Sequence, residues 1–148
     1  MLNEKGFHMN ILLFLTPKQE VTLLYEDYTI GQALRSMENG GHPAVPIIRR
    51  SGEYVGTVTE GDLLWYIRKT GLSFEVAETL PLQNVPHSRD NKPVLASMDL
   101  TQLLENSMEQ NFAPVVDDRG MFCGIITRKR VLSHLCDKMK LETFLKRA

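Results

Sequence analysis

The sequence lacks most of the features that identify a secreted, membrane or metal-binding protein. It has two cysteines in 148 residues, and their spacing fits neither a metal site nor a disulfide framework. The longest apolar run covers residues 11–15, far fewer than the ~20 residues that cross a bilayer. No signal peptide is evident. We therefore expect a cytoplasmic protein without a membrane span.

The sequence also lacks a large excess of positive or negative charge, and it lacks recognisable groups of catalytic residues. The 17 basic and 18 acidic residues leave a formal net charge of −1, whereas nonspecific nucleic-acid binding requires a basic surface that displaces counterions. No Ser-His-Asp set, metal-ligand cluster or pair of carboxylates can be recognised. We expect no nucleic-acid partner, no enzymatic activity, no catalytic residues, no metal and no cofactor.

What the sequence does contain is an internal repeat. Residues 56–62 read GTVTEGD and residues 124–130 read GIITRKR; upstream, residues 45–48 (VPII) match residues 113–116 (APVV). All these pairs are 68 positions apart. In both copies the match leads through a threonine into a leucine-bearing amphipathic run. Landmarks that recur in the same order and at the same spacing indicate a duplicated structural unit.

Each copy predicts the order strand, helix, strand, strand, helix. In the first copy we expect a strand at 21–24, a helix that starts near Thr29 and ends at the glycines of residues 40–41, and a hairpin over 44–58. The chain then divides into an N-terminal lead-in (1–17), repeat 1 (18–70), a linker (71–91), repeat 2 (92–137) and a C-terminal tail (138–148).

The predicted helices carry apolar residues that suggest a second copy of the chain as a partner. Leu34, Met37, Leu63 and Trp65 form helix faces that we expect to be exposed on one chain. A twofold axis would bury such faces against each other. We therefore predict a homodimer. In repeat 2 we expect Met108 to lie in the core.

These motifs resemble the tandem CBS-domain pair, or Bateman module, over roughly residues 18–135. Among stand-alone pairs, the chain is similar to Firmicute proteins that sense cyclic di-AMP. The resemblance implies an α+β fold in which two β-α-β-β-α repeats pack as a pseudo-twofold pair, with two chains joined into a disc. It also implies an adenosine ligand such as AMP, ADP, ATP, S-adenosylmethionine or a cyclic dinucleotide, and the regulation of another protein.

The residues at the end of each hairpin suit this chemistry. A helix start presents unpaired backbone N–H groups to an anion, and the hydroxyl of Thr59 or Thr127 can cap the helix or reach a phosphate or sugar oxygen. The carboxylate of Asp62 can accept hydrogen bonds from both ribose hydroxyls. Strands that contain Pro46 or Pro114 offer an apolar slot with unpaired backbone groups for adenine.

The resemblance further implies that the helix start of each repeat faces the strands of the other repeat. One cleft would combine Thr59 and Asp62 with residues 92–95 and 112–114, including Val94, Ala113 and Pro114. The other would combine Thr127, Arg128 and Arg130 with residues 18–22 and 42–46, including Val21, His42, Ala44 and Pro46. Arg130 stands where the family has its ribose-binding acid, so this second cleft is either a phosphate-rich site or empty.

Two functions from different classes remain open at this stage. The first is a regulatory module that senses an adenosine-containing nucleotide (AMP, ADP, ATP or cyclic di-AMP) and modulates an unidentified partner protein. The alternative is a ligand-free scaffold for dimerisation or partner binding. In that case Thr59 and Asp62 form an ordinary helix cap, and Arg128 and Arg130 belong to a solvated face.

Overall fold

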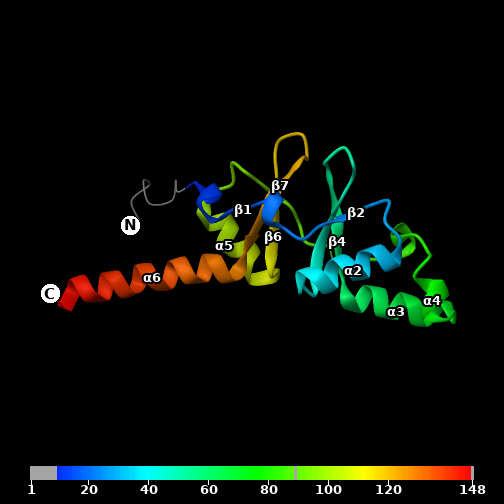
Figure 1. Ribbon diagram of the computed structural model, residues 1–148. Helices are drawn as coiled ribbons and strands as arrows, with labels where there is room; N and C mark the ends of the chain where they lie inside the picture. Colours follow the sequence, from blue (N-terminus) through cyan, green and yellow to red (C-terminus); the bar gives the residue numbers. More distant parts are fainter. Residues whose placement is uncertain (1–9, 89, 148) are drawn as a thin grey trace.

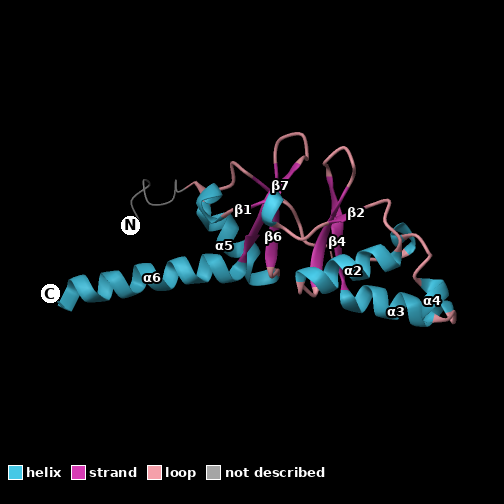
Figure 2. Ribbon diagram, in the orientation of Figure 1, coloured by secondary structure: helices cyan, strands magenta, loops and turns pink. Residues whose placement is uncertain are grey.

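The computed structural model describes residues 10–88 and 90–147, which form an α+β fold of two similar halves (Figures 1 and 2). The elements of repeat 1 are β2 (Leu24–Tyr25), α2 (Ile30–Gly40), β3 (Ala44–Ile48), β4 (Tyr54–Thr59) and α3 (Glu60–Thr70). Those of repeat 2 are β5 (Val94–Leu95), α5 (Leu100–Glu109), β6 (Phe112–Val116), β7 (Phe122–Thr127) and α6 (Arg128–Arg147). The predicted order of elements is confirmed in both repeats.

Shorter elements precede and join the repeats. The first elements of the described residues are η1 (Ile11–Phe14), β1 (Thr16–Pro17) and η2 (Lys18–Glu20), and the linker contains α4 (Phe74–Ala77) and η3 (Leu82–Asn84). The strand predicted from residue 21 therefore begins later, at Leu24.

Reciprocal capping fixes the start of three helices. The Thr29 hydroxyl accepts the N–H of Gln32 while the Gln32 side chain accepts the N–H of Thr29, and the pairs Thr59 with Asp62 and Asp99 with Gln102 repeat the pattern. This capping box satisfies N–H groups that the first helical turn leaves unpaired. At its other end α2 is closed by Gly41 with φ 68°, as the two glycines predicted.

The strands form two sheets whose hairpins lie side by side between the helices (Figure 1). One sheet has the order β2-β3-β4, and the other has the order β1-β7-β6-β5. In both, the hairpin strands are antiparallel and the first strand of the repeat is parallel to its neighbour. The hairpin turns meet: Tyr54 donates its N–H to the Gly120 carbonyl, and Phe122 donates to the Gly52 carbonyl.

Each repeat's core is completed by a segment from outside that repeat. Leu82 and Val85 of the linker are buried in the core of repeat 1. Ile11 and Phe14 of η1 are buried in the core of repeat 2, and β1 pairs antiparallel with β7. The N-terminal segment thus belongs structurally to the second repeat, and this places the chain that follows β1 between the two sheets.

The structure corrects three of the predicted exposures. Met37 and Leu63 are buried in the core of repeat 1, and Leu34 packs against it, because these side chains lie on the helix faces turned toward the sheet. On α3 the neighbouring residue Trp65 is outward and 56% exposed, as predicted. Met108 is 80% exposed rather than buried. It lies near the end of α5, beyond the turns that cover the sheet.

Helix α6 continues through the predicted tail and projects away from the two sheets (Figure 1). Its last turns expose Met139, Leu141, Phe144 and Leu145. Within the described residues, no helix has the length and apolar character needed to cross a bilayer.

Candidate functional site

A cavity of about 320 Å³ lies between the two repeats. Its size falls within the range of small-molecule sites, and its wall is mainly apolar with a few polar groups, as such sites usually are. The residues that line it are Thr16, Glu20, Val21, Thr22, His42, Pro43, Ala44, Val45, Pro46, Asn111, Phe112, Ile125 and Thr127.

The strand pairing explains why these distant segments meet. Thr16 of β1 lies opposite Ile125 of β7, and the 3-10 turn η2 that follows packs beside β7. Residues 20–22 are thereby brought to the cavity. The first residues of β3 and β6, including Ala44 and Phe112, form further parts of the cavity wall. Because Pro46 and Pro114 have no N–H group, each hairpin lacks a ladder donor at these positions.

Thr127 stands where β7 ends and α6 begins. Its hydroxyl accepts the N–H of Arg130 at 3.2 Å and caps the helix. The N–H of Arg128 donates to the carbonyl of Asn111 at 2.8 Å, while the Arg128 guanidinium donates to the Ser107 carbonyl at 2.6 Å. That cation therefore lies near the C-terminal end of α5, where the helix dipole favours it.

A second hollow adjoins the cavity at this helix start. It measures about 560 Å³ and is lined by Asn111, Thr127, Arg128, Lys129, Leu132, Ser133 and Cys136. Asn111 and Thr127 line both spaces. Arg128 and Lys129 line this open hollow mainly with apolar atoms, so their charged ends lie near it rather than inside it, and Glu20 borders the cavity.

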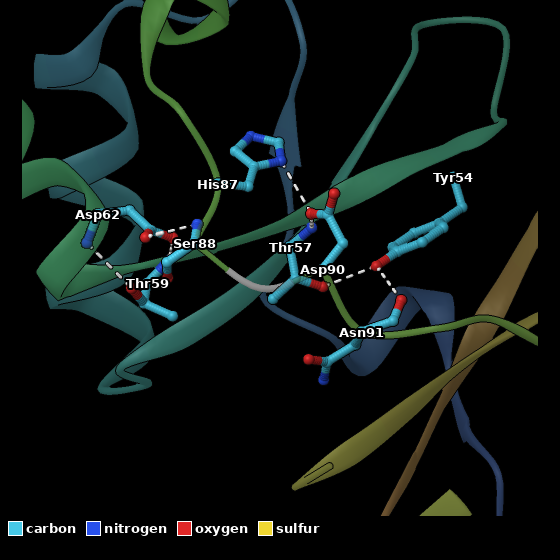
Figure 3. A network of polar contacts seen from close by, with 8 residues as sticks. All are labelled: Tyr54, Thr57, Thr59, Asp62, His87, Ser88, Asp90 and Asn91. Atoms are coloured by element: carbon cyan, nitrogen blue, oxygen red, sulfur yellow. Dashed lines mark hydrogen bonds and ion pairs between the residues drawn. The ribbon is translucent and has the colours of Figure 1, made fainter. Parts of the chain in front are cut away.

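The helix start of repeat 1 has a different environment, dominated by the linker (Figure 3). One carboxylate oxygen of Asp62 accepts the N–H of Thr59 at 3.0 Å, and the other accepts the N–H of Ser88 at 3.0 Å. Burial alone would raise the pKa of Asp62, but the hydrogen bonds from Ser88 and Thr59 outweigh it and hold that pKa below its ordinary value. Asp62 is 7% exposed, and its carboxylate is ionised at neutral pH and already engaged.

The linker makes further polar contacts along β4 (Figure 3). Asp90 accepts the N–H of Thr57 at 2.9 Å and contacts the ring of His87 at 2.8 Å. The Tyr54 hydroxyl donates to the Asn91 carbonyl and lies 2.7 Å from the Thr57 hydroxyl. Burial raises the pKa of Tyr54 to about 12. Nothing local to the polar linker or to β4 indicates that the two meet, so no role for Ser88, Asp90 or Tyr54 could be predicted from the sequence.

The structure brings some of the predicted site residues together and separates others. The cavity gathers five of them: Val21, His42, Ala44, Pro46 and Thr127. Arg128 borders the adjoining hollow, and the side chain of Arg130 is exposed. Val94 and Ala113 are buried in the core of repeat 2, Pro114 is also buried, and Thr59 and Asp62 lie against the linker.

Several lining residues carry no individual signal for a site in the sequence, among them Glu20, Thr16 and Asn111. Glu20 lies within the segment 18–22 that was expected at this cleft, but no motif marked it. Thr16 and Asn111 reach the cavity only because β1 joins the second sheet and Asn111 precedes β6.

A sequence model of the CBS domain matches the chain twice, over residues 15–69 and 83–137. No curated protein gives a significant match.

Solved structures show the same architecture. CbpB in complex with c-di-AMP superposes with a TM-score of 0.84 at 23% identity, covering 98% of this chain and 95% of that one. A CBS domain protein from Streptococcus pneumoniae gives 0.78 at 27% identity, with 91% and 94% covered. CBSX2 in complex with AMP gives 0.70 at 22% identity, with 88% and 98% covered. These likenesses establish the fold of two CBS repeats.

Proposed function

Since this chain belongs to the CBS domain family, with one domain in each repeat, we propose that it is a regulatory module that binds an adenosine-containing nucleotide and modulates a partner protein. The observation that carries the proposal is the cavity between the repeats, with the capped helix start at Thr127 in its wall. Structures with the same fold that contain c-di-AMP or AMP support a nucleotide as the ligand.

The two adjoining spaces suit the two parts of a nucleotide. The apolar side chains of Val21, Ala44 and Ile125 provide a surface for adenine. The Thr127 hydroxyl accepts the N–H of Arg130 and can still donate its own hydrogen to a phosphate oxygen. Arg128 and Lys129 border the hollow beyond Thr127 and favour the negative charge there. We therefore place the nucleoside in the cavity and the phosphates toward the hollow, with exposed Arg130 as a further cation.

The Asp62 cleft is secondary in this proposal. Both oxygens of its carboxylate accept backbone hydrogen bonds, so a ribose competes there with the linker. For a ribose to bind to Asp62, the hydrogen bond from the N–H of Ser88 to the Asp62 carboxylate must break.

A matched pair of threonine variants tests the cavity. Thr59 and Thr127 both cap a helix after a hairpin, but only Thr127 lines the cavity. Thr59→Val and Thr127→Val should each lower stability by about 1 kcal/mol through loss of the cap. Thr127→Val should also weaken nucleotide binding about tenfold, since a hydrogen bond to a charged group contributes ~1.5–3 kcal/mol. Thr59→Val should bind normally.

The measurement is calorimetry with AMP, ADP, ATP and cyclic di-AMP, supported by thermal shift. A ligand at 100 times its dissociation constant adds ~2.7 kcal/mol of stability. GMP is the control for the base. The proposal is overturned if none of the adenine nucleotides stabilises the protein.

That outcome would leave the ligand-free scaffold as the function. The observation that favours this second candidate is the set of exposed apolar side chains on helices α3, α4 and α6, including Trp65, Phe74 and Phe144. Binding of a partner protein with unchanged affinity in the presence and absence of nucleotide would support it.

A further inference from the structure

We propose that Glu20 determines the specificity of the cavity: its carboxylate accepts hydrogen bonds from the ribose hydroxyls and directs the phosphates toward the hollow beyond Thr127. This inference rests on the proposed nucleotide site and adds to it a residue, a preferred sugar and an orientation of the ligand.

The first observation is the charge of the cavity wall. Among the described residues that line it, Glu20 is the one carboxylate, and none is a lysine or an arginine. The other polar side chains are threonines, His42 and Asn111. Among residues 10–88 and 90–147, Glu20 forms no ion pair. Glu20 is an exposed residue at the rim of the cavity, so a ligand that enters meets a solvated carboxylate that no described cation pairs with.

The consequence for a nucleotide follows from the chemistry of its parts. A carboxylate beside an apolar wall loses water when a ligand enters, and it needs hydrogen-bond donors in exchange. A ribose presents two adjacent hydroxyls that can both donate to the two oxygens of one carboxylate. Phosphate oxygens offer no donor when ionised, and they repel the carboxylate. Ribose is thus favoured beside Glu20, and phosphate is disfavoured there.

The second observation is the position of the cations. Arg128 and Lys129 line the hollow, and Glu20 lines the cavity, with Asn111 and Thr127 at the boundary between the two. A nucleotide with its sugar near Glu20 and its phosphates beyond Thr127 keeps the phosphates away from the carboxylate and near the cations of Arg128 and Lys129. The reverse orientation brings phosphate to the carboxylate.

Glu20 also supplies a group that the helix starts do not. At the start of α3 the acid Asp62 is engaged with Thr59 and Ser88. At the corresponding place in α6 the residue is Arg130, which cannot accept a hydrogen bond. Within the cavity, an ionised acceptor for ribose comes instead from η2, which pairing of β1 with β7 brings there.

The test compares AMP with 2′-deoxy-AMP by calorimetry on wild type, Glu20→Ala and the control Glu38→Ala. Glu38 is an exposed glutamate on α2 and does not line the cavity. We expect wild type and Glu38→Ala to prefer AMP by about 10- to 100-fold, the effect of losing one hydrogen bond to a charged group. In Glu20→Ala this ratio should fall to about one.

A second variant separates the charge of Glu20 from its hydrogen bonds. Glu20→Gln removes the charge but keeps one acceptor oxygen. It should retain part of the preference for ribose, and its affinity for ATP relative to AMP should rise severalfold.

The outcomes distinguish this inference from the proposed function. If wild type binds AMP but Glu20→Ala keeps the full preference for ribose, the role of Glu20 is wrong and the nucleotide site stands. If wild type binds no adenine nucleotide, both are wrong.

Discussion

The carboxylate of Asp62 joins two segments that are far apart in the sequence. It accepts the N–H of Thr59 within the capping box of α3 and the N–H of Ser88 in the linker. One acidic side chain therefore starts a helix and fastens the linker to it. Both roles require the ionised form, because a protonated carboxyl is a weaker acceptor.

Asp62→Asn should lower the free energy of unfolding at pH 7 by about 1–2 kcal/mol, through weaker hydrogen bonds to a buried group. The pKa of Asp62 lies below its ordinary value in the folded state. Its contribution is therefore present above about pH 4, the pKa of an unfolded aspartate, and is lost as the pH falls through the folded pKa.

Urea unfolding of both proteins between pH 7 and pH 2.5 checks this. The difference in stability between wild type and Asp62→Asn should shrink at the acid end. Asp118→Asn, in the exposed hairpin turn, is the control for loss of one surface charge. A constant difference across this range would contradict the assigned role of the carboxylate.

The two cysteines should differ in reactivity. Cys123 is half-buried in β7, and burial together with the nearby carboxylate of Asp117 raises the pKa of its thiol. Cys136 is exposed on α6. Because the thiolate is the reactive form, iodoacetamide at pH 8 should modify Cys136 at least about tenfold faster. Single-thiol variants Cys123→Ser and Cys136→Ser, followed by mass spectrometry, measure the two rates; equal rates would contradict the prediction.

At the scale of elements, the pairing of β1 with β7 is the contact on which the cavity depends. Gly124 lies opposite Pro17 with φ 155°, a conformation that side chains rarely adopt. A Cβ atom there would collide with the carbonyl oxygen of Thr16. The glycine therefore allows β1 to approach β7, and Thr16 then lines the cavity.

Gly124→Ala should destabilise the protein by about 1–3 kcal/mol, since both the backbone conformation and the close approach are lost. It should also weaken nucleotide binding, because β1 moves away from the cavity. The matched control is Gly61→Ala inside α3, where an added Cβ meets only ordinary contacts and helix propensity improves. Urea unfolding and calorimetry of both variants measure these effects; wild-type behaviour of Gly124→Ala would show that β1 can shift without consequence.

For the molecule as a whole, the apolar side chains exposed to water favour association with a second copy of the chain. Leu64 and Trp65 on α3, and Phe74 and Val76 on α4, are each about half exposed or more. These helices lie together at one end of the molecule (Figure 1). Exposed apolar residues gathered in this way commonly mark an interface. We propose that they form a homodimer contact.

Sedimentation at tens of micromolar should therefore show a dimer. Trp65→Glu should weaken the dimer at least about tenfold, because a charge would be buried in the contact. Leu13→Glu, at an exposed position in η1, is the control and should remain dimeric. A monomeric wild type at this concentration would rule out the dimer.

Features that depend on neighbouring residues could be predicted from the amino-acid sequence. The repeat at an offset of 68 positions predicted two equivalent halves, and both have the expected order of elements. The helix starts at Thr29 and Thr59 followed from capping residues, and the end of α2 followed from its glycines. Such interactions lie within one turn of a helix or one hairpin, so their residue types and spacing are enough to predict them.

Contacts between segments far apart in the sequence became evident from the folded structure. Nothing local to Phe14 shows that it completes the core of repeat 2, and nothing local to Val85 shows that it completes that of repeat 1. The same holds for Asp62, whose partner Ser88 belongs to the linker, and for Glu20, which reaches the cavity because β1 pairs with β7. The energy of these contacts comes from burial and hydrogen bonds between segments far apart in the chain. Which segments meet is fixed only when the two sheets pack together, so a local sequence pattern cannot predict these contacts.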